Sequence, residues 1–234
     1  MTNPGARRIR VLSTLAVLGA MRELSPAWQA ESGCVVDADF APTVALLVRL
    51  RGGEAADIAI LTDQAMEELI AEGLMLPGSR IDVALSYVGI AVRAGAAKPD
   101  ITTPERLRAA LLQAKSIAYS RIGASGIFFA GLIERLGIAD AVNAKSRIVP
   151  TGFTAELAAR GEVELAVQQV SELLAVPGIE LVGKLPAELQ TPGTFSAGVL
   201  RHAQHPHAAR SLLRFLTAPS AAPALRRSGL EPSE

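Results

Sequence analysis

Short apolar segments that are typical of buried strands alternate with amphipathic segments along almost the whole chain. The expected strands cover residues 9–12, 34–40, 57–61, 86–93, 117–119, 147–149, 164–167, 179–182 and 195–200. Helical segments lie between most of them. Pro42 and Thr103-Pro104 stand where helices begin, and Gly73, Gly137 and Gly161 where they end. This alternation predicts an α/β fold of mixed, mostly parallel sheets flanked by helices.

Composition excludes several classes of function. The 23 Lys and Arg residues are balanced by 23 Asp and Glu residues, so the chain lacks the basic surface that nucleic acid binding needs. No apolar run approaches the roughly 20 residues that span a bilayer, and we expect no membrane insertion. The single cysteine, Cys34, forms no intrachain disulfide, and we interpret it as a buried strand residue.

No repeat and no low-complexity linker divides the chain, so its division must come from the strands. We expect a two-lobe fold in which lobe 1 is discontinuous, with residues 1–92 plus 194–234, and lobe 2 contains residues 93–193. Strands 86–93 and 194–200 would then cross between the lobes. Ligands of open α/β sheets bind outside the carboxyl ends of the strands, which here predicts a ligand in the cleft between the lobes.

One strand–turn–helix unit, Lys115–Gly137, has the features of an anion site. Its turn is rich in small residues, including Ser125 and Gly126, and a long apolar helix follows. Glycine lets the backbone approach a ligand closely, and the free N–H groups of a helix start attract an anion. The alternative is an ordinary turn between a strand and a helix. Arg121, just before the turn, is a candidate to bind a carboxylate, or else a solvated loop arginine.

Hydroxyl and amide side chains follow other expected strands. Ser13 and Thr14 end the first strand, and Thr43 lies in the first turn of a helix. Gln168 and Gln169 follow a short apolar strand. All five are candidate ligand donors. The alternatives are that the first two cap the next helix, that the third is a solvated residue, and that one glutamine serves the backbone.

Two further groups of residues suggest other sites. His202, His205 and His207 are clustered, but the last two would not share one face of a helix, so we expect no metal. We expect no cofactor either. Asp57 and Asp63 flank a strand, and we expect Asp63 to cap the following helix.

Four stretches, taken in order, resemble the periplasmic-binding-protein-like family of type II, in its molybdate-binding branch. They are the strand ending at Ser13-Thr14, Gly53–Leu74, Lys115–Gly137 and the C-terminal pattern His205–Leu230. The resemblance covers nearly the whole chain. It implies two lobes joined by crossing strands that close on an oxyanion held by hydroxyls and backbone amides, in a substrate-binding protein of an ABC transporter.

Two departures from the molybdate-binding pattern concern the ligand. Relatives of that branch carry a Gly-Ser-Ser-Gly type loop after the second strand, where this chain has Ala41-Pro42-Thr43-Val44. They carry a tyrosine where this chain has Gln168 and Gln169. Glutamine offers NH₂ donors and a carbonyl acceptor, which suits a carboxylic acid with further polar substituents better than a bare oxyanion. The ligand predicted from these replacements is a di- or tricarboxylate.

Three segments, VLSTLAVLGAM, AYSRIGASGIFFAGLIERLGI and ELAVQQ, are more similar still to the aconitate isomerases, a catalytic offshoot of this scaffold. Such an enzyme needs a base for an allylic proton. Tyr119, Glu172 and Cys34 qualify by residue type alone. We therefore expect first a binding protein for a small organic anion. A cofactor-independent isomerase of an unsaturated tricarboxylate is the alternative, and a molybdate-binding transporter component is the second alternative.

The N-terminal segment concerns the compartment. Arg7, Arg8 and Arg10 precede the apolar run Val11–Met21, as in a signal peptide, but hydroxyl residues interrupt the run and no A-x-A site follows. We interpret the run as a strand and a helix. The expected location is the cytoplasm for the chain as written, or the periplasm if a leader was trimmed. The expected partners are the small-molecule anion and, if the protein is exported, the membrane subunits of an ABC transporter.

Overall fold

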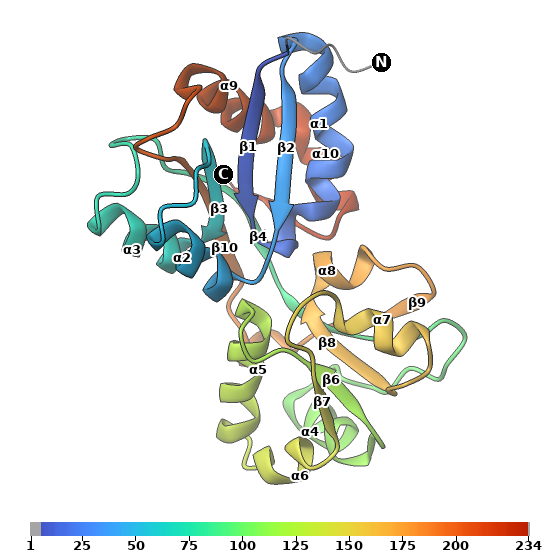
Figure 1. Cartoon of the computed structure of the whole chain (residues 1–234). Helices are drawn as coiled ribbons and strands as arrows, with labels where there is room; N and C mark the ends of the chain where they lie inside the picture. The colour runs from blue at the N-terminus through green and yellow to red at the C-terminus, as the bar shows by residue number, and fades with distance from the viewer. Residues whose placement is uncertain (1–5, 234) are drawn as a thin grey trace. The chain divides into compact units, whose positions relative to one another are not determined.

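The computed structural model describes residues 6–233, which form two compact units (Figure 1). Unit 1 contains the described residues up to Leu85 and those from Gly193 onward, and unit 2 contains Ser86–Pro192. The first boundary lies earlier than the expected one after residue 92. The reason is that strand 86–93 does not cross between units as one piece. β4 (Ile81–Ser86) pairs in the first sheet and β5 (Val88–Arg93) in the second.

Unit 1 is built on a six-stranded sheet of order β11-β4-β10-β3-β1-β2. Besides β4, its strands are β1 (Arg8–Ser13), β2 (Val35–Phe40), β3 (Ile58–Thr62), β10 (Gly193–Val199) and β11 (Glu231–Pro232). Its helices are η1 (Leu15–Val17), α1 (Leu18–Ser32), α2 (Thr43–Arg51), α3 (Asp63–Ala71), α9 (Pro206–Leu216), η3 (Pro219–Ala221) and α10 (Ala222–Arg227). β1 runs parallel to β2 and β3, so the carboxyl ends of these three strands share one edge.

Unit 2 is built on a five-stranded sheet of order β7-β6-β8-β5-β9. Besides β5, its strands are β6 (Ile117–Tyr119), β7 (Ser146–Ile148), β8 (Leu165–Gln169) and β9 (Ile179–Lys184). Its helices are α4 (Pro104–Gln113), α5 (Ala124–Arg135), α6 (Ala139–Asn143), α7 (Thr154–Ala159), α8 (Val170–Leu174) and η2 (Ala187–Leu189). β6 is parallel to β7 and β8, while β5 is antiparallel to β8 and β9.

Successive residues of the central strands are buried on opposite faces of each sheet. In β1, Val11 packs in the cluster that contains Trp28 of α1, while the next residue, Leu12, packs with Leu46 of α2 and Met66 of α3. Unit 2 likewise has two core clusters. Because side chains alternate along a strand, both faces of these sheets need helices to cover them. The predicted class, α/β with mixed sheets flanked by helices, is confirmed.

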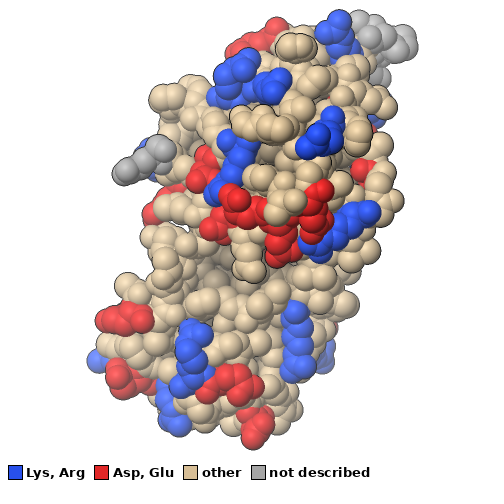
Figure 2. All heavy atoms as spheres, turned by 90° about the vertical axis from the view of Figure 1, so that its left-hand side faces the viewer, with Lys and Arg blue, Asp and Glu red and all other residues tan. Residues whose placement is uncertain are grey.

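The face of unit 1 that carries α2 and α3 is covered by ion pairs. Figure 2 shows acidic side chains gathered among basic ones on this face. Arg49 lies 2.5 Å from Asp39 and 2.6 Å from Glu54, and Arg51 lies 2.6 Å from Glu72. The Arg49 guanidinium holds the pKa of Glu54 below its ordinary value. These two arginines are therefore engaged in pairs within the unit. No helix in residues 6–233 has the length and apolar character to cross a membrane.

Candidate functional site

Unit 1 brings hydroxyl side chains to the carboxyl edge of its parallel strands. Ser13 is the last residue of β1, and its carbonyl accepts a hydrogen bond from the N–H of Ala41 at 3.0 Å. That bond draws the segment leading to Thr43 alongside the end of β1. Ser13, Thr14 and Thr43 are all buried. The three residues predicted in this part of the chain therefore share one edge of the sheet.

The hydroxyls of Ser13 and Thr14 differ in their hydrogen bonding. The Ser13 hydroxyl donates to the carbonyl of Thr14 at 3.1 Å. The Oγ1 of Thr14 is buried without a partner among the described residues. Thr14 stands at the N-cap position of η1, yet its side chain makes no capping bond, so the helix-capping alternative does not account for it. Since buried polar atoms nearly always have a partner, this hydroxyl is the better candidate for a ligand contact.

In unit 2 the turn between β6 and α5 is held by Ser120, which is not among the predicted residues. Its hydroxyl oxygen accepts hydrogen bonds from the N–H groups of Ile122 at 3.2 Å and Gly123 at 3.3 Å. Gly126 lies so close to this turn that a Cβ there would be 1.7 Å from the Ser120 carbonyl oxygen. The N–H of Gly126 donates to Gly123 at 3.1 Å. Glycine at position 126 is thus required for packing, and its proposed ligand contact stays a prediction.

Ser125 is buried in the first turn of α5, which has 12 residues and no acidic side chain in that turn. A helix start of this kind keeps N–H groups free for an anion. The predicted role of Ser125 is compatible with this geometry.

The Arg121 side chain is held within unit 2. Its guanidinium lies 6.0 Å from the ring centroid of Tyr119 and donates to the Tyr119 hydroxyl at 3.4 Å. It also donates to Oδ1 of Asn143, at 3.3 Å. A carboxylate would have to compete with these contacts, so the ligand role of Arg121 stays a prediction.

Gln168 and Gln169, the last two residues of β8, are both buried but bond differently. Oε1 of Gln168 accepts from the Thr154 N–H at 2.8 Å, and its Nε2 donates to the Gly152 carbonyl at 3.2 Å. Gln168 therefore holds the segment that enters α7. Oε1 of Gln169 is buried without a partner among residues 6–233. Of the two predicted ligand residues, Gln169 is the one with hydrogen-bonding capacity to spare.

A buried carboxyl group adjoins this glutamine pair. Glu172 is the third residue of α8 and only 8% exposed. It accepts hydrogen bonds from the backbone N–H of Gln169 and the side chain of Gln168. Burial raises the pKa of Glu172 to about 7, although both hydrogen bonds act in the opposite direction. The sequence offers Glu172 as a possible base by residue type alone, and it gives no local signal of this burial.

The remaining sequence candidates have structural roles. Asp57 is buried, and its carboxylate accepts from the N–H groups of Arg10 at 2.9 Å and His205 at 2.8 Å. The α3 cap is Thr62, not Asp63 as expected, because the helix begins at Asp63 itself. Within the described residues, no group of three His, Cys, Asp or Glu side chains is arranged to hold a metal ion.

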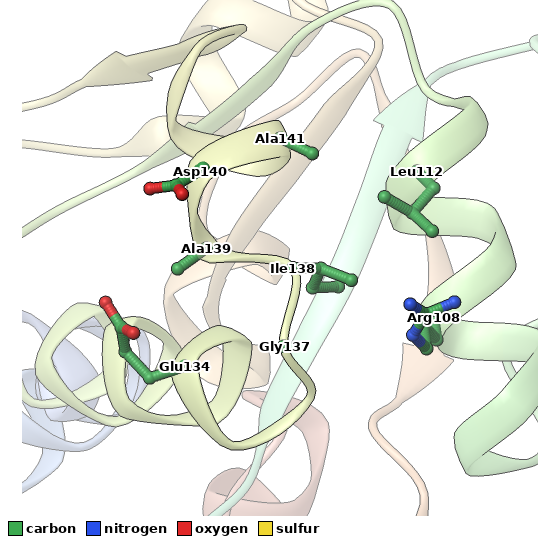
Figure 3. A pocket seen from close by; sticks show the side chains of 8 residues that line it. All are labelled: Arg108, Leu112, Glu134, Gly137, Ile138, Ala139, Asp140 and Ala141. Carbon is green, nitrogen blue, oxygen red and sulfur yellow. The ribbon is translucent and has the colours of Figure 1, made fainter.

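A surface hollow of about 380 Å³ lies elsewhere in unit 2 (Figure 3). It is lined by Arg108 and Leu112 of α4 and by residues around Gly137, at the end of α5 remote from Ser125. The Arg108 Nε already donates to the Leu136 carbonyl at 3.4 Å. None of the predicted site residues lines this hollow, so we do not include it in the candidate site.

Comparison with known proteins shows the family to which this chain belongs. Residues 9–231 match the family of bacterial extracellular solute-binding proteins. An aconitate isomerase from Pseudomonas sp is 37% identical over 230 residues, which cover 96% of this chain and 87% of that protein. The resemblances to periplasmic binding proteins and to aconitate isomerase that the sequence predicts are both confirmed.

Two solved structures show the same fold. The periplasmic molybdate-binding protein of Azotobacter vinelandii has a TM-score of 0.81 at 18% identity, over 97% of this chain and 100% of that one. A sulfate-binding protein from Mycobacterium tuberculosis has a TM-score of 0.77 at 16% identity, over 97% of this chain and 88% of that one. At such identities the likeness concerns the fold alone. By its sequence match and its fold, the chain belongs to the bacterial extracellular solute-binding protein family.

Proposed function

We propose that this chain binds a small di- or tricarboxylate and isomerises an unsaturated one of the aconitate type. The observation that carries the proposal is the 37% identity to an aconitate isomerase across nearly the whole chain. The candidate residues support it, because each unit has, at the carboxyl edge of its parallel strands, a buried polar atom with no partner among the described residues. These atoms are Thr14 Oγ1 and Gln169 Oε1.

The chemistry of these groups favours a carboxylate. Thr14 supplies a hydroxyl donor, and the first turn of α5 supplies N–H donors near Ser125. The Gln169 amide can donate through its NH₂ group or accept through Oε1, since a half-turn exchanges them. A polycarboxylic acid presents acceptors and, when partly protonated, a donor, so it can satisfy both kinds of partner. A bare tetrahedral oxyanion offers acceptors only, so it could pair with the NH₂ group of Gln169 but not with its Oε1.

Isomerisation additionally requires a group that can carry a proton. Interconversion of cis- and trans-aconitate moves an allylic proton from one carbon to another, and a positioned side chain speeds such a transfer by about 10²–10⁴-fold. The buried carboxyl of Glu172 favours catalysis over binding alone, since a pKa of about 7 lets it both accept and release a proton near neutral pH. If turnover is absent, we propose a binding protein, with the membrane subunits of a transporter as partner.

A ligand screen followed by an activity assay tests this proposal. In a thermal-shift and calorimetric screen of di- and tricarboxylates, molybdate and sulfate, we expect aconitate to stabilise the protein most. A ligand present at 100 times its Kd stabilises by about 2.7 kcal/mol. Chromatography should then show the cis/trans ratio of aconitate changing without added cofactor. Nanomolar affinity for molybdate, with weaker binding of every carboxylate, would contradict the proposal.

A further inference from the structure

We infer that Glu172 is the group that takes the proton from the substrate and returns it, an inference that rests on the proposed isomerase function. Glu172 lies in α8, which follows β8 directly at the carboxyl edge of the parallel strands of unit 2. Three residues near this corner carry buried polar atoms that have no partner among the described residues.

The chain entering β5 runs beside the start of α8. Val88 pairs with Gln169, and the Val170 N–H donates to the Tyr87 carbonyl at 2.8 Å. This register brings Ser86 next to the same corner, because it precedes Tyr87. Three side-chain oxygens here are buried and have no partner within the described part of the chain: Ser86 Oγ, Gln169 Oε1 and Ser171 Oγ.

These three are among only five such side-chain atoms in the described part of the chain. Their concentration around residues 169–172 indicates that a polar molecule belongs there, since native proteins leave very few buried polar groups unsatisfied. A ligand that satisfied these atoms would lie against Gln169 and Ser171, which come shortly before Glu172 in the sequence. We therefore infer that a polar ligand binds beside these residues.

Glu172 itself has no charged partner among residues 6–233. Its hydrogen bonds come from the Gln169 N–H and the Gln168 side chain, and no charged group is among the causes of its pKa shift. α8 packs against α7, β5, β8 and β9. The charged residues of those elements are Glu156, Arg93, Glu180 and Lys184. Because no cation neutralises Glu172, its charge depends on whether it holds a proton, as a proton-transfer group requires.

The step conserves atoms and electrons. The Glu172 carboxylate removes a proton from the methylene carbon of aconitate, so a C–H bond breaks and an O–H bond forms. The electron pair left behind spreads over the allylic carbons and their carboxylates. The same proton then returns to the other end of the allylic unit, where an O–H bond breaks and a C–H bond forms. The double bond has moved and Glu172 is a carboxylate again.

If Glu172 only capped α8, its replacement by glutamine would have a different effect. The third residue of a helix often accepts a hydrogen bond from the N-cap N–H, and glutamine serves this purpose as well as glutamate. Glu172→Gln keeps the size of the side chain and an oxygen that can accept from Gln169. It removes only the capacity to carry a proton. The variant should therefore fold and bind normally if the role is capping, and lose turnover if the role is proton transfer.

The test compares the parent with Glu172→Gln and with Glu156→Gln as a matched control. Glu156 is also the third residue of its helix, α7, but it is exposed. Each protein is given cis-aconitate, and three quantities are measured: its affinity by calorimetry, its rate of isomerisation by chromatography, and the pH dependence of kcat/KM. We expect Glu172→Gln to bind aconitate within a few-fold of the parent and to isomerise it about 10²–10⁴-fold more slowly.

The outcomes separate this inference from the function beneath it. Parent activity that depends on a group titrating near neutral pH, kept in Glu156→Gln and lost in Glu172→Gln, supports the inference. An active parent with an equally active Glu172→Gln variant overturns the role of Glu172 and leaves the isomerase function intact. A parent that binds aconitate but leaves both isomers unchanged overturns the function, and the role of Glu172 with it.

Discussion

Gln168 accepts a hydrogen bond from the Thr154 backbone N–H at 2.8 Å, so the side chain at the end of β8 holds the start of α7. The side-chain oxygen of its neighbour Gln169 is buried and has no hydrogen-bond partner in residues 6–233. Of these two adjacent glutamines, Gln168 therefore supports the fold, and Gln169 has an oxygen available to contact a ligand. This division predicts opposite effects for the same substitution.

Replacing each glutamine by leucine separates the two roles. Gln168→Leu should lower the free energy of unfolding by about 1–3 kcal/mol, because the buried Thr154 N–H loses its partner. Gln169→Leu should leave that free energy nearly unchanged, since an unsatisfied oxygen is removed. It should weaken aconitate binding instead. Urea denaturation and calorimetry measure the two effects, and equal destabilisation by both substitutions would contradict the division.

Glycine at position 126 should be indispensable for the fold. Gly126→Ala places a Cβ 1.7 Å from the Ser120 carbonyl oxygen, so β6 and α5 must separate. We expect a loss of at least about 1–3 kcal/mol, the usual cost of overpacking, or failure to fold. Gly131→Ala is the matched control in the same helix, because its Cβ would meet only Arg135 at 3.7 Å. That control should gain up to about 1 kcal/mol from helix propensity. Thermal denaturation of both variants decides the matter.

A negative charge at the start of α5 should oppose an anionic ligand. Ser125→Asp puts a carboxylate where the helix N–H groups attract one, so the protein should remain folded. Binding of aconitate should weaken by about tenfold to a hundredfold, since a hydrogen bond to a charged group is worth about 1.5–3 kcal/mol. Ser125→Ala, which adds no charge, should weaken it less. If calorimetry gives Ser125→Asp the affinity of the parent, the turn has only a structural role.

The buried carboxyl of Glu172 should make stability fall as pH rises. Its pKa is about 7 in the folded protein and about 4.5 ordinarily, so between these values the folded state holds a proton that the unfolded state has released. This bound proton contributes up to about 3 kcal/mol to the free energy of unfolding. The contribution is fully present below pH 4.5 and is lost as the pH rises through 7. The comparison is urea denaturation of the unliganded parent and Glu172→Gln across this range. Parallel pH profiles would show that Glu172 titrates in its ordinary range.

The sequence predicts the fold well because apolar and amphipathic segments, which are local patterns, mark the alternating strands and helices. Ser13 ends a predicted strand, Thr14 follows it, and Ser125 begins the helix after another strand. Ligands of parallel sheets bind at the carboxyl ends of the strands, so the sequence could predict these candidates. The burial of Glu172 has no local signal, because it depends on β5, which is distant in sequence. The need for glycine at 126 likewise arises from the close approach of Ser120. The sequence predicts one continuous crossing strand over residues 86–93, because the apolar run does not show the break between β4 and β5.

The most direct test of the proposed function follows aconitate by proton NMR in deuterated buffer. The parent protein is mixed with pure cis-aconitate, without added cofactor, and the vinyl and methylene signals of both isomers are recorded over hours. We predict growth of the trans isomer toward a fixed ratio, approached equally from pure trans-aconitate, with deuterium entering the substrate whenever the carried proton exchanges with solvent. Tight binding with neither isomer changed and no deuterium incorporated would contradict the account.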